Sequence, residues 1–71
     1  MRKTIKQLRE EAGLTQLQLA YRLGVTPGAV SLWERAASEP KALQLRALAD
    51  VFGVSMDVID LEPFQESKSA A

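Results

Sequence analysis

The chain has 71 residues, enough for one domain, and its 46% hydrophobic and 25% charged residues are typical of a globular protein. It contains no histidine and no cysteine, which excludes a disulfide framework, a thiolate site and the usual general base of an enzyme. No apolar run reaches the ~18 residues of a membrane span, and the first residues show no signal-peptide pattern, so we expect a cytoplasmic protein with no membrane partner.

Positive charge is concentrated in the first part of the chain, although the formal net charge is zero. Residues 1–46 hold eight Lys or Arg and four Asp or Glu, whereas residues 47–71 hold one and five. Such asymmetry is a weak indication of nucleic-acid contact on one face. Charges scattered over a solvated surface explain it equally well.

Two capping boxes open the first two predicted helices, at residues 4–7 and 15–18. In each box a threonine oxygen and a glutamine side chain satisfy backbone amides that have no helical partner. Apolar residues follow at helical spacing, and the two helices are predicted to end at Gly13 and Gly24.

A third helix is predicted to begin after Thr26, a good N-cap, with Pro27 at the first helical position. It should run to about Arg35. The chain restarts at residues 38–40, and a fourth apolar periodic segment ends at Gly53.

Ser55 is predicted to cap a short fifth helix, which would complete an all-α domain over residues 1–63, followed by a flexible tail at 64–71. If Val58 and Leu61 face the core, Met56, Ile59 and Phe64 lie on another side of this helix. That arrangement predicts a dimer surface. The alternative is that all of these residues close the small core.

The segment that joins the second and third helices has the features of a helix-turn-helix. Two helices can cross steeply if the first has a small residue at the crossing, the turn tolerates a positive φ, and the second directs apolar residues inward. Ala20 supplies the small residue and Gly24 the turn. The inward residues are Val25, Val30 and Trp33.

Over roughly residues 3–61 the chain resembles the phage-repressor and Cro-like helix-turn-helix family, in the stretches LREEAGLTQLQLAYRLGVTPGAVSLWER and LRALADVFGVSMDVI. The resemblance implies a compact five-helix bundle of the lambda-repressor type, with residues 27–35 as the recognition helix. It also implies that Gln16 binds a DNA phosphate and that Arg9 and Glu34 form a structural ion pair. We therefore expect Gln16 to matter for DNA binding and not for folding.

A recognition helix enters the major groove end first, so the residues of its first two turns meet the base edges. These residues are Pro27, Gly28, Ala29, Ser31 and Leu32. Phosphate contacts come from helix N-termini and from nearby polar or arginine side chains. The candidates for these contacts are Gln16, Thr26 and Arg35.

The base-facing positions depart from the family pattern, which has Gln, Asn, Arg or Ser at several of them and a basic residue with glycine in the following loop. That loop reads Ala-Ala-Ser-Glu over residues 36–39. One interpretation is that Ala29 and Leu32 contact thymine methyl groups, with a polar contact from Ser31 and a contribution from DNA shape. The other is that the apolar face docks a protein.

Apolar residues outside the recognition helix favour the second interpretation. Leu17 and Tyr21 are four residues apart on the second helix, and Leu43 lies on the fourth, where the family pattern is usually polar. Single apolar residues on a surface are also normal.

Gly28 also allows two interpretations. A glycine inside a helix costs up to about 1 kcal/mol relative to alanine. Close approach of the backbone to DNA would explain it, and so would tolerance at an exposed first turn.

Paired carboxylates are present, but they do not indicate an enzyme. Asp57 and Asp60 lie near the start of a short helix, where negative charge is favoured, and Glu10 and Glu11 point in different directions on the first helix. We expect a DNA-binding transcriptional regulator, acting as a repressor that binds double-stranded DNA as a homodimer, with no cofactor or metal. The alternative is an antitoxin-like protein-interaction module.

Overall fold

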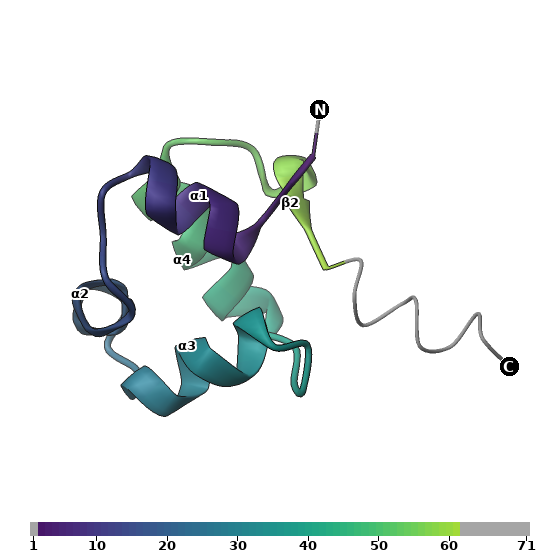
Figure 1. Cartoon of the computed structure of the whole chain (residues 1–71). Helices are drawn as coiled ribbons and strands as arrows, with labels where there is room; N and C mark the ends of the chain where they lie inside the picture. The colour runs from purple at the N-terminus through teal and green to yellow at the C-terminus, as the bar shows by residue number, and fades with distance from the viewer. Residues whose placement is uncertain (1, 62–71) are drawn as a thin grey trace, which may run out of the picture.

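The computed structural model describes residues 2–61, which form four α-helices, one 3-10 turn and one pair of short strands. The helices are α1 (Ile5–Glu11), α2 (Gln16–Leu23), α3 (Pro27–Glu34) and α4 (Ala42–Phe52). The strands are β1 (Lys3–Thr4) and β2 (Ile59–Asp60), and the 3-10 turn η1 is Met56–Val58. Figure 1 shows the start of α3 on the side of the molecule away from the strand pair.

The first two helices begin at the predicted capping boxes. The backbone N–H of Gln7 donates to Thr4 Oγ1 over 3.1 Å, and the Gln7 side chain accepts from the Thr4 N–H over 2.8 Å. Thr15 and Gln18 repeat this exchange at 3.0 and 2.9 Å. Thr26 caps α3 by accepting from the Ala29 N–H over 3.2 Å, which confirms all three predicted starts.

All four helices end in the same pair of backbone hydrogen bonds. At the end of α2, Gly24 donates to the carbonyl of Tyr21 over 3.3 Å and Val25 donates to the carbonyl of Ala20 over 3.1 Å. This Schellman motif needs one residue with positive φ, and Gly24 has a φ of +71°. Its counterparts at the other three ends are Gly13, Ala36 and Gly53.

The α3 end is the one that lacks glycine. Ala36 has a φ of +59° and donates to the carbonyl of Trp33 over 3.1 Å, and Ala37 donates to the carbonyl of Leu32 over 2.9 Å. An alanine in this conformation carries a steric cost that glycine does not. Among residues 2–61, Ala36 is the only residue other than glycine with a positive φ.

The core lies where the helices meet, and its buried residues are Ile5, Leu8, Leu19, Ala20, Val30, Trp33, Leu48, Ala49 and Ile59. Three residues predicted to point inward or to lie at the helix crossing, Ala20, Val30 and Trp33, belong to it. Val25 is half-buried and packs against it. The helix-turn-helix segment therefore supplies a large part of the core.

The predicted fifth helix is wrong in detail. Ser55 caps the turn η1 by accepting from the Asp57 N–H over 3.3 Å, but the chain then becomes extended and β2 pairs in parallel with β1. In this extended segment Ile59 points into the core and is only 3% exposed, so its predicted place on an outer dimer surface is also wrong. Met56 stays exposed, whereas Phe64 and the predicted tail lie outside the described residues.

Within residues 2–61, none of the helices has the length and apolar character needed to cross a membrane.

Candidate nucleic-acid interface

The α2 and α3 helices form one packed unit with a short turn between them. Ala20 is almost fully buried, which lets the two helices approach closely, and Gly24 provides the left-handed turn residue. Val30 and Trp33 fix α3 to the core from one side. The opposite side of α3 is consequently left facing outward.

The outward side of α3 carries the residues predicted to meet DNA bases. Pro27 and Gly28 are exposed, and Leu32, one turn after Gly28, is 38% exposed. Ser31 is half-buried, and Ala29 is half-buried and packs partly against the core. The structure thus places the predicted base-facing residues on one helix, with Gly28 and Leu32 exposed one turn apart.

The predicted phosphate-binding residues lie at three helix ends. Gln16 is the first residue of α2 and Thr26 the N-cap of α3, where free backbone N–H groups favour an anion. Arg35 follows α3 directly and is exposed. The three side chains come from separate ends of the same two-helix unit.

A buried ion pair links this unit to α1. Arg9 Nε donates to Glu34 Oε2 over 2.6 Å and Arg9 Nη2 donates to Glu34 Oε1 over 3.3 Å. The two side chains are 12% and 4% exposed. A third donor, Arg9 Nη1, reaches the carbonyl of Leu14 over 2.7 Å, so all the guanidinium nitrogens have an acceptor.

This ion pair keeps the Arg9 side chain charged. Its hydrogen bond to Glu34 raises the pKa of Arg9 above the usual value, although burial acts in the opposite direction. The Arg9–Glu34 pair that the resemblance implied is thus present in the structure.

Gln16 belongs to the same network, which the sequence did not indicate. Its Nε2 donates to Glu34 Oε1 over 3.0 Å, so Glu34 on α3 holds both Arg9 of α1 and Gln16 of α2. One amide hydrogen of Gln16 is engaged in this bond, and the other is free of it. The residue expected to bind a phosphate therefore also joins two helices.

A family model described as helix-turn-helix matches residues 5–59, which is most of the chain. The chain belongs to the helix-turn-helix family. This is the family of the phage-repressor and Cro-like regulators, and it assigns a DNA-binding helix-turn-helix domain. No curated protein and no solved structure gave a significant match.

The helix-turn-helix domain has an apolar groove on the outer side of α2. Leu17 and Tyr21 line it together with Leu14, Gln18 and Arg22, and it has a volume of about 520 Å³. Tyr21 is 88% exposed. Leu43 is also exposed but does not line this groove, so the structure brings together two of the three residues expected on a protein-binding surface.

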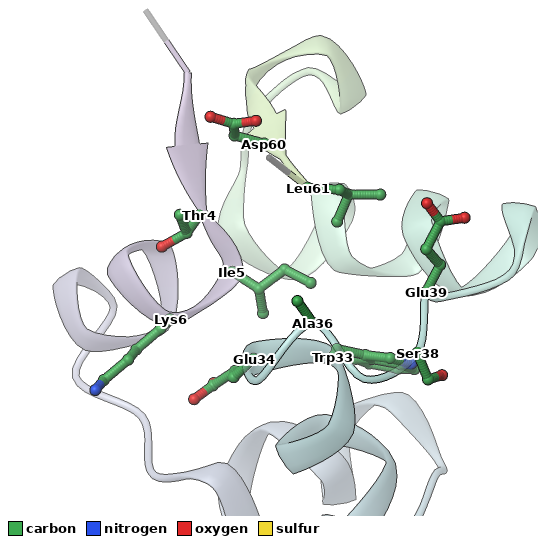
Figure 2. A pocket seen from close by; sticks show the side chains of 10 residues that line it. All are labelled: Thr4, Ile5, Lys6, Trp33, Glu34, Ala36, Ser38, Glu39, Asp60 and Leu61. Carbon is green, nitrogen blue, oxygen red and sulfur yellow. The ribbon is translucent and has the colours of Figure 1, made fainter. Parts of the chain in front are cut away.

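A second, smaller pocket of about 120 Å³ lies between the end of α3 and the strand pair (Figure 2). Its side chains come from the two strands, from α1, from the end of α3 and from the loop after it, with Trp33 and Ile5 among them. Within residues 2–61, no three Asp, Glu, His or Cys side chains gather to form a metal site. The pocket has room for a few water molecules and lies away from the outward side of α3.

The carboxylate pairs considered for catalysis lie among surface ion pairs and helix-start contacts. Glu11 accepts from Lys3 Nζ with both oxygens at 2.9 Å, and Asp60 lies 3.9 Å from Arg2. Asp57 lies in the first turn of η1 and is exposed. Each pair therefore includes a carboxylate in an ordinary surface ion pair.

Proposed function

We propose that this protein is a transcriptional regulator that binds double-stranded DNA in a sequence-specific way, as a homodimer on a two-fold operator, and represses by occupying it. We place its action in the cytoplasm. The observation that carries the proposal is the outward side of α3, which is left free while Val30 and Trp33 bury the other side. An α-helix held in this way fits the major groove of B-DNA.

Two helix ends next to this surface support the docking. The first residue of α2 and the cap of α3 present N-terminal backbone amides and the side chains of Gln16 and Thr26. Contacts of this kind bind phosphates and fix the register of a recognition helix. Arg35 adds a positive charge at the other end of α3.

A dimer is proposed because two-fold pairs match the two half-sites of an operator, one helical turn or about 34 Å apart. The domain is also small, and a core of this size supplies only about 3–5 kcal/mol, so association would stabilise it. Within residues 2–61, Met56 is the exposed apolar residue of the predicted dimer surface. Sedimentation at tens of micromolar protein, with and without DNA, tests this part: a clean monomer in both samples would contradict it.

DNA binding is tested by selection from random duplexes followed by gel-shift titration of the selected site. We expect Gln16→Ala to weaken binding to every duplex by a similar factor, because a phosphate contact carries no sequence information. Arg22→Ala is the control, since Arg22 lines the apolar groove on the outer side of α2. If Gln16→Ala binds as tightly as the parent, the proposed docking is wrong.

The second candidate function is a protein-interaction module, and the exposed Leu17 and Tyr21 side chains favour it. The double variant Leu17→Ser, Tyr21→Ser separates the two functions. The DNA-binding proposal expects its affinity for the selected duplex to be unchanged. A selection that enriches no duplex at all would favour the interaction module instead.

A further inference from the structure

The outward side of α3 has almost no hydrogen-bonding groups. Between Pro27 and Glu34 the polar side chains are Ser31, which is half-buried, and Glu34, whose carboxylate is bound to Arg9 and Gln16. The Thr26 hydroxyl just before the helix accepts from a backbone amide. The exposed large apolar side chain of α3 is Leu32.

The major groove offers one apolar group that such a surface can bind. Each base pair presents donors and acceptors there, and thymine adds a C5-methyl group. Placing Leu32 over bare donors or acceptors removes water from them without replacing the hydrogen bonds, which is unfavourable. Placing it on a methyl group buries apolar surface on both sides, which is favourable.

Gly28 makes this contact geometrically accessible. A Cβ atom at Gly28 would meet nothing closer than Thr26 Oγ1, at 3.8 Å, so the folded chain does not require a glycine there. Gly28 and Leu32 lie four residues apart, on one face of α3. A bare backbone at Gly28 allows the first turn to enter the groove deeply, which brings Leu32 down to the level of the base edges.

We propose that α3 selects its operator through C5-methyl groups in the major groove, mainly by contact with Leu32 and Ala29, so that thymine and 5-methylcytosine are read as equivalent. This inference rests on the proposed DNA binding and names the chemistry that the recognition helix reads. It predicts half-sites rich in thymine at the positions under α3. It also predicts that methylating a cytosine at such a position strengthens binding.

The test uses the full chain and the duplex obtained by selection. Each thymine of the half-sites is replaced in turn by uracil, which removes only the methyl group. We expect at least one position at which affinity falls about fourfold for each half-site, the value for one buried methyl group. At that position a 5-methylcytosine·guanine pair should bind about fourfold more tightly than an unmethylated cytosine·guanine pair.

Two variants of similar size assign the effect to α3. At the position that Leu32 contacts, Leu32→Gln should bind the thymine and uracil duplexes equally, because an amide gains nothing from the methyl group. Leu17→Gln, at an exposed leucine of α2, should discriminate as the parent does. If Leu32→Gln keeps the parent's discrimination, the assignment to Leu32 is wrong.

Measurements on the parent protein alone can overturn the inference. The test therefore does not depend on whether the variants fold. Equal affinity for the selected duplex and its fully uracil-substituted form would contradict methyl recognition and leave the proposed DNA binding intact. A selection that enriches no duplex would contradict both.

Discussion

The Arg9–Glu34 contact combines a short hydrogen bond of 2.6 Å with nearly complete burial, so removing one side chain leaves the other buried without its partner. Arg9→Met leaves the Glu34 carboxylate, which is 4% exposed, without its cation. We expect a loss of about 3–5 kcal/mol in the free energy of unfolding, the usual cost of breaking a buried pair from one side. Urea denaturation measures it.

Lys3→Met is the matched control, because the Lys3–Glu11 pair lies on the surface. Its removal should change the stability by about 1 kcal/mol at most. Equal losses for the two variants would mean that the buried pair contributes no more to stability than the surface pair.

The raised pKa of Arg9 predicts that the stability contributed by the Arg9–Glu34 pair depends on pH only in the alkaline range. The stabilisation is fully present below the usual arginine pKa and is lost only as the pH rises through the raised value.

Gly28 affects folding and binding in opposite directions. Since a Cβ atom there has open space, Gly28→Ala should raise the stability by up to about 1 kcal/mol, through helix propensity. If the backbone approaches the groove closely, the same methyl group should weaken operator binding at least about tenfold. A melting curve and a gel-shift titration on one protein sample give both values. A higher melting temperature with unchanged affinity would mean that Gly28 is merely tolerated.

At the scale of the helices, the end of α3 stores strain that the other three ends avoid. Ala36 adopts a positive φ where the equivalent residues are glycines. Ala36→Gly should therefore stabilise the domain by roughly 0.5 kcal/mol, after allowing for the lost contacts of a half-buried methyl group and for the greater freedom of glycine in the unfolded chain. Thermal unfolding should show a rise of about 4 °C.

Ala37→Gly controls for the general effect of glycine in this loop. Ala37 has no positive φ, so the substitution adds freedom to the unfolded chain and should lower the stability. If both variants lower it, the strain inferred at Ala36 is absent.

The helix starts could be predicted from the sequence because a cap is a local device. Thr4, Thr15 and Thr26 each satisfy an amide three residues away, and no distant residue is needed. The extended conformation of Ile59 depends instead on pairing with β1, at the other end of the described chain. Local periodicity contains no information on that pairing, and it therefore suggested a fifth helix.

Part of the candidate site could be predicted from the sequence and part could not. The residues on the outward side of α3 could be predicted from the position of this one helix in the family pattern, and the structure leaves Leu32 and Gly28 exposed there. The bond from Gln16 to Glu34 could not be predicted, because it joins residues that are close only once α2 and α3 have crossed.

For the whole molecule, the small number of cations among the candidate phosphate ligands predicts DNA binding that depends weakly on salt. Of the three candidate phosphate ligands, Gln16 and Thr26 are neutral, and Arg35 is the charged one. One cation per subunit of a dimer corresponds to a slope of about −2 in a plot of log affinity against log salt concentration. Gel-shift titrations at several salt concentrations, from about 50 to about 200 mM, measure the slope.

A pair of charge variants tests whether the position of the charge matters. Glu39→Lys adds a cation in the loop after α3 and should steepen the slope by about 2 in a dimer. Asp57→Lys changes the net charge equally but lies in η1, next to β2 and away from the start of α3 (Figure 1). Its effect should be small because salt screens distant charges. Similar slopes for the two variants would contradict the proposed orientation on DNA.

The pairing of β1 with β2 joins the two ends of the described chain, with Lys3 opposite Ile59 and Thr4 opposite Asp60. This ladder is only two residues long and can open without unwinding any helix. Its amide hydrogens should therefore exchange with solvent through local opening, whereas the helical amides of fully buried Leu19, Val30 and Leu48 should exchange only when the whole domain unfolds. Hydrogen exchange followed by NMR would then show two classes of protection, and a single class would mean that the chain ends separate only on global unfolding.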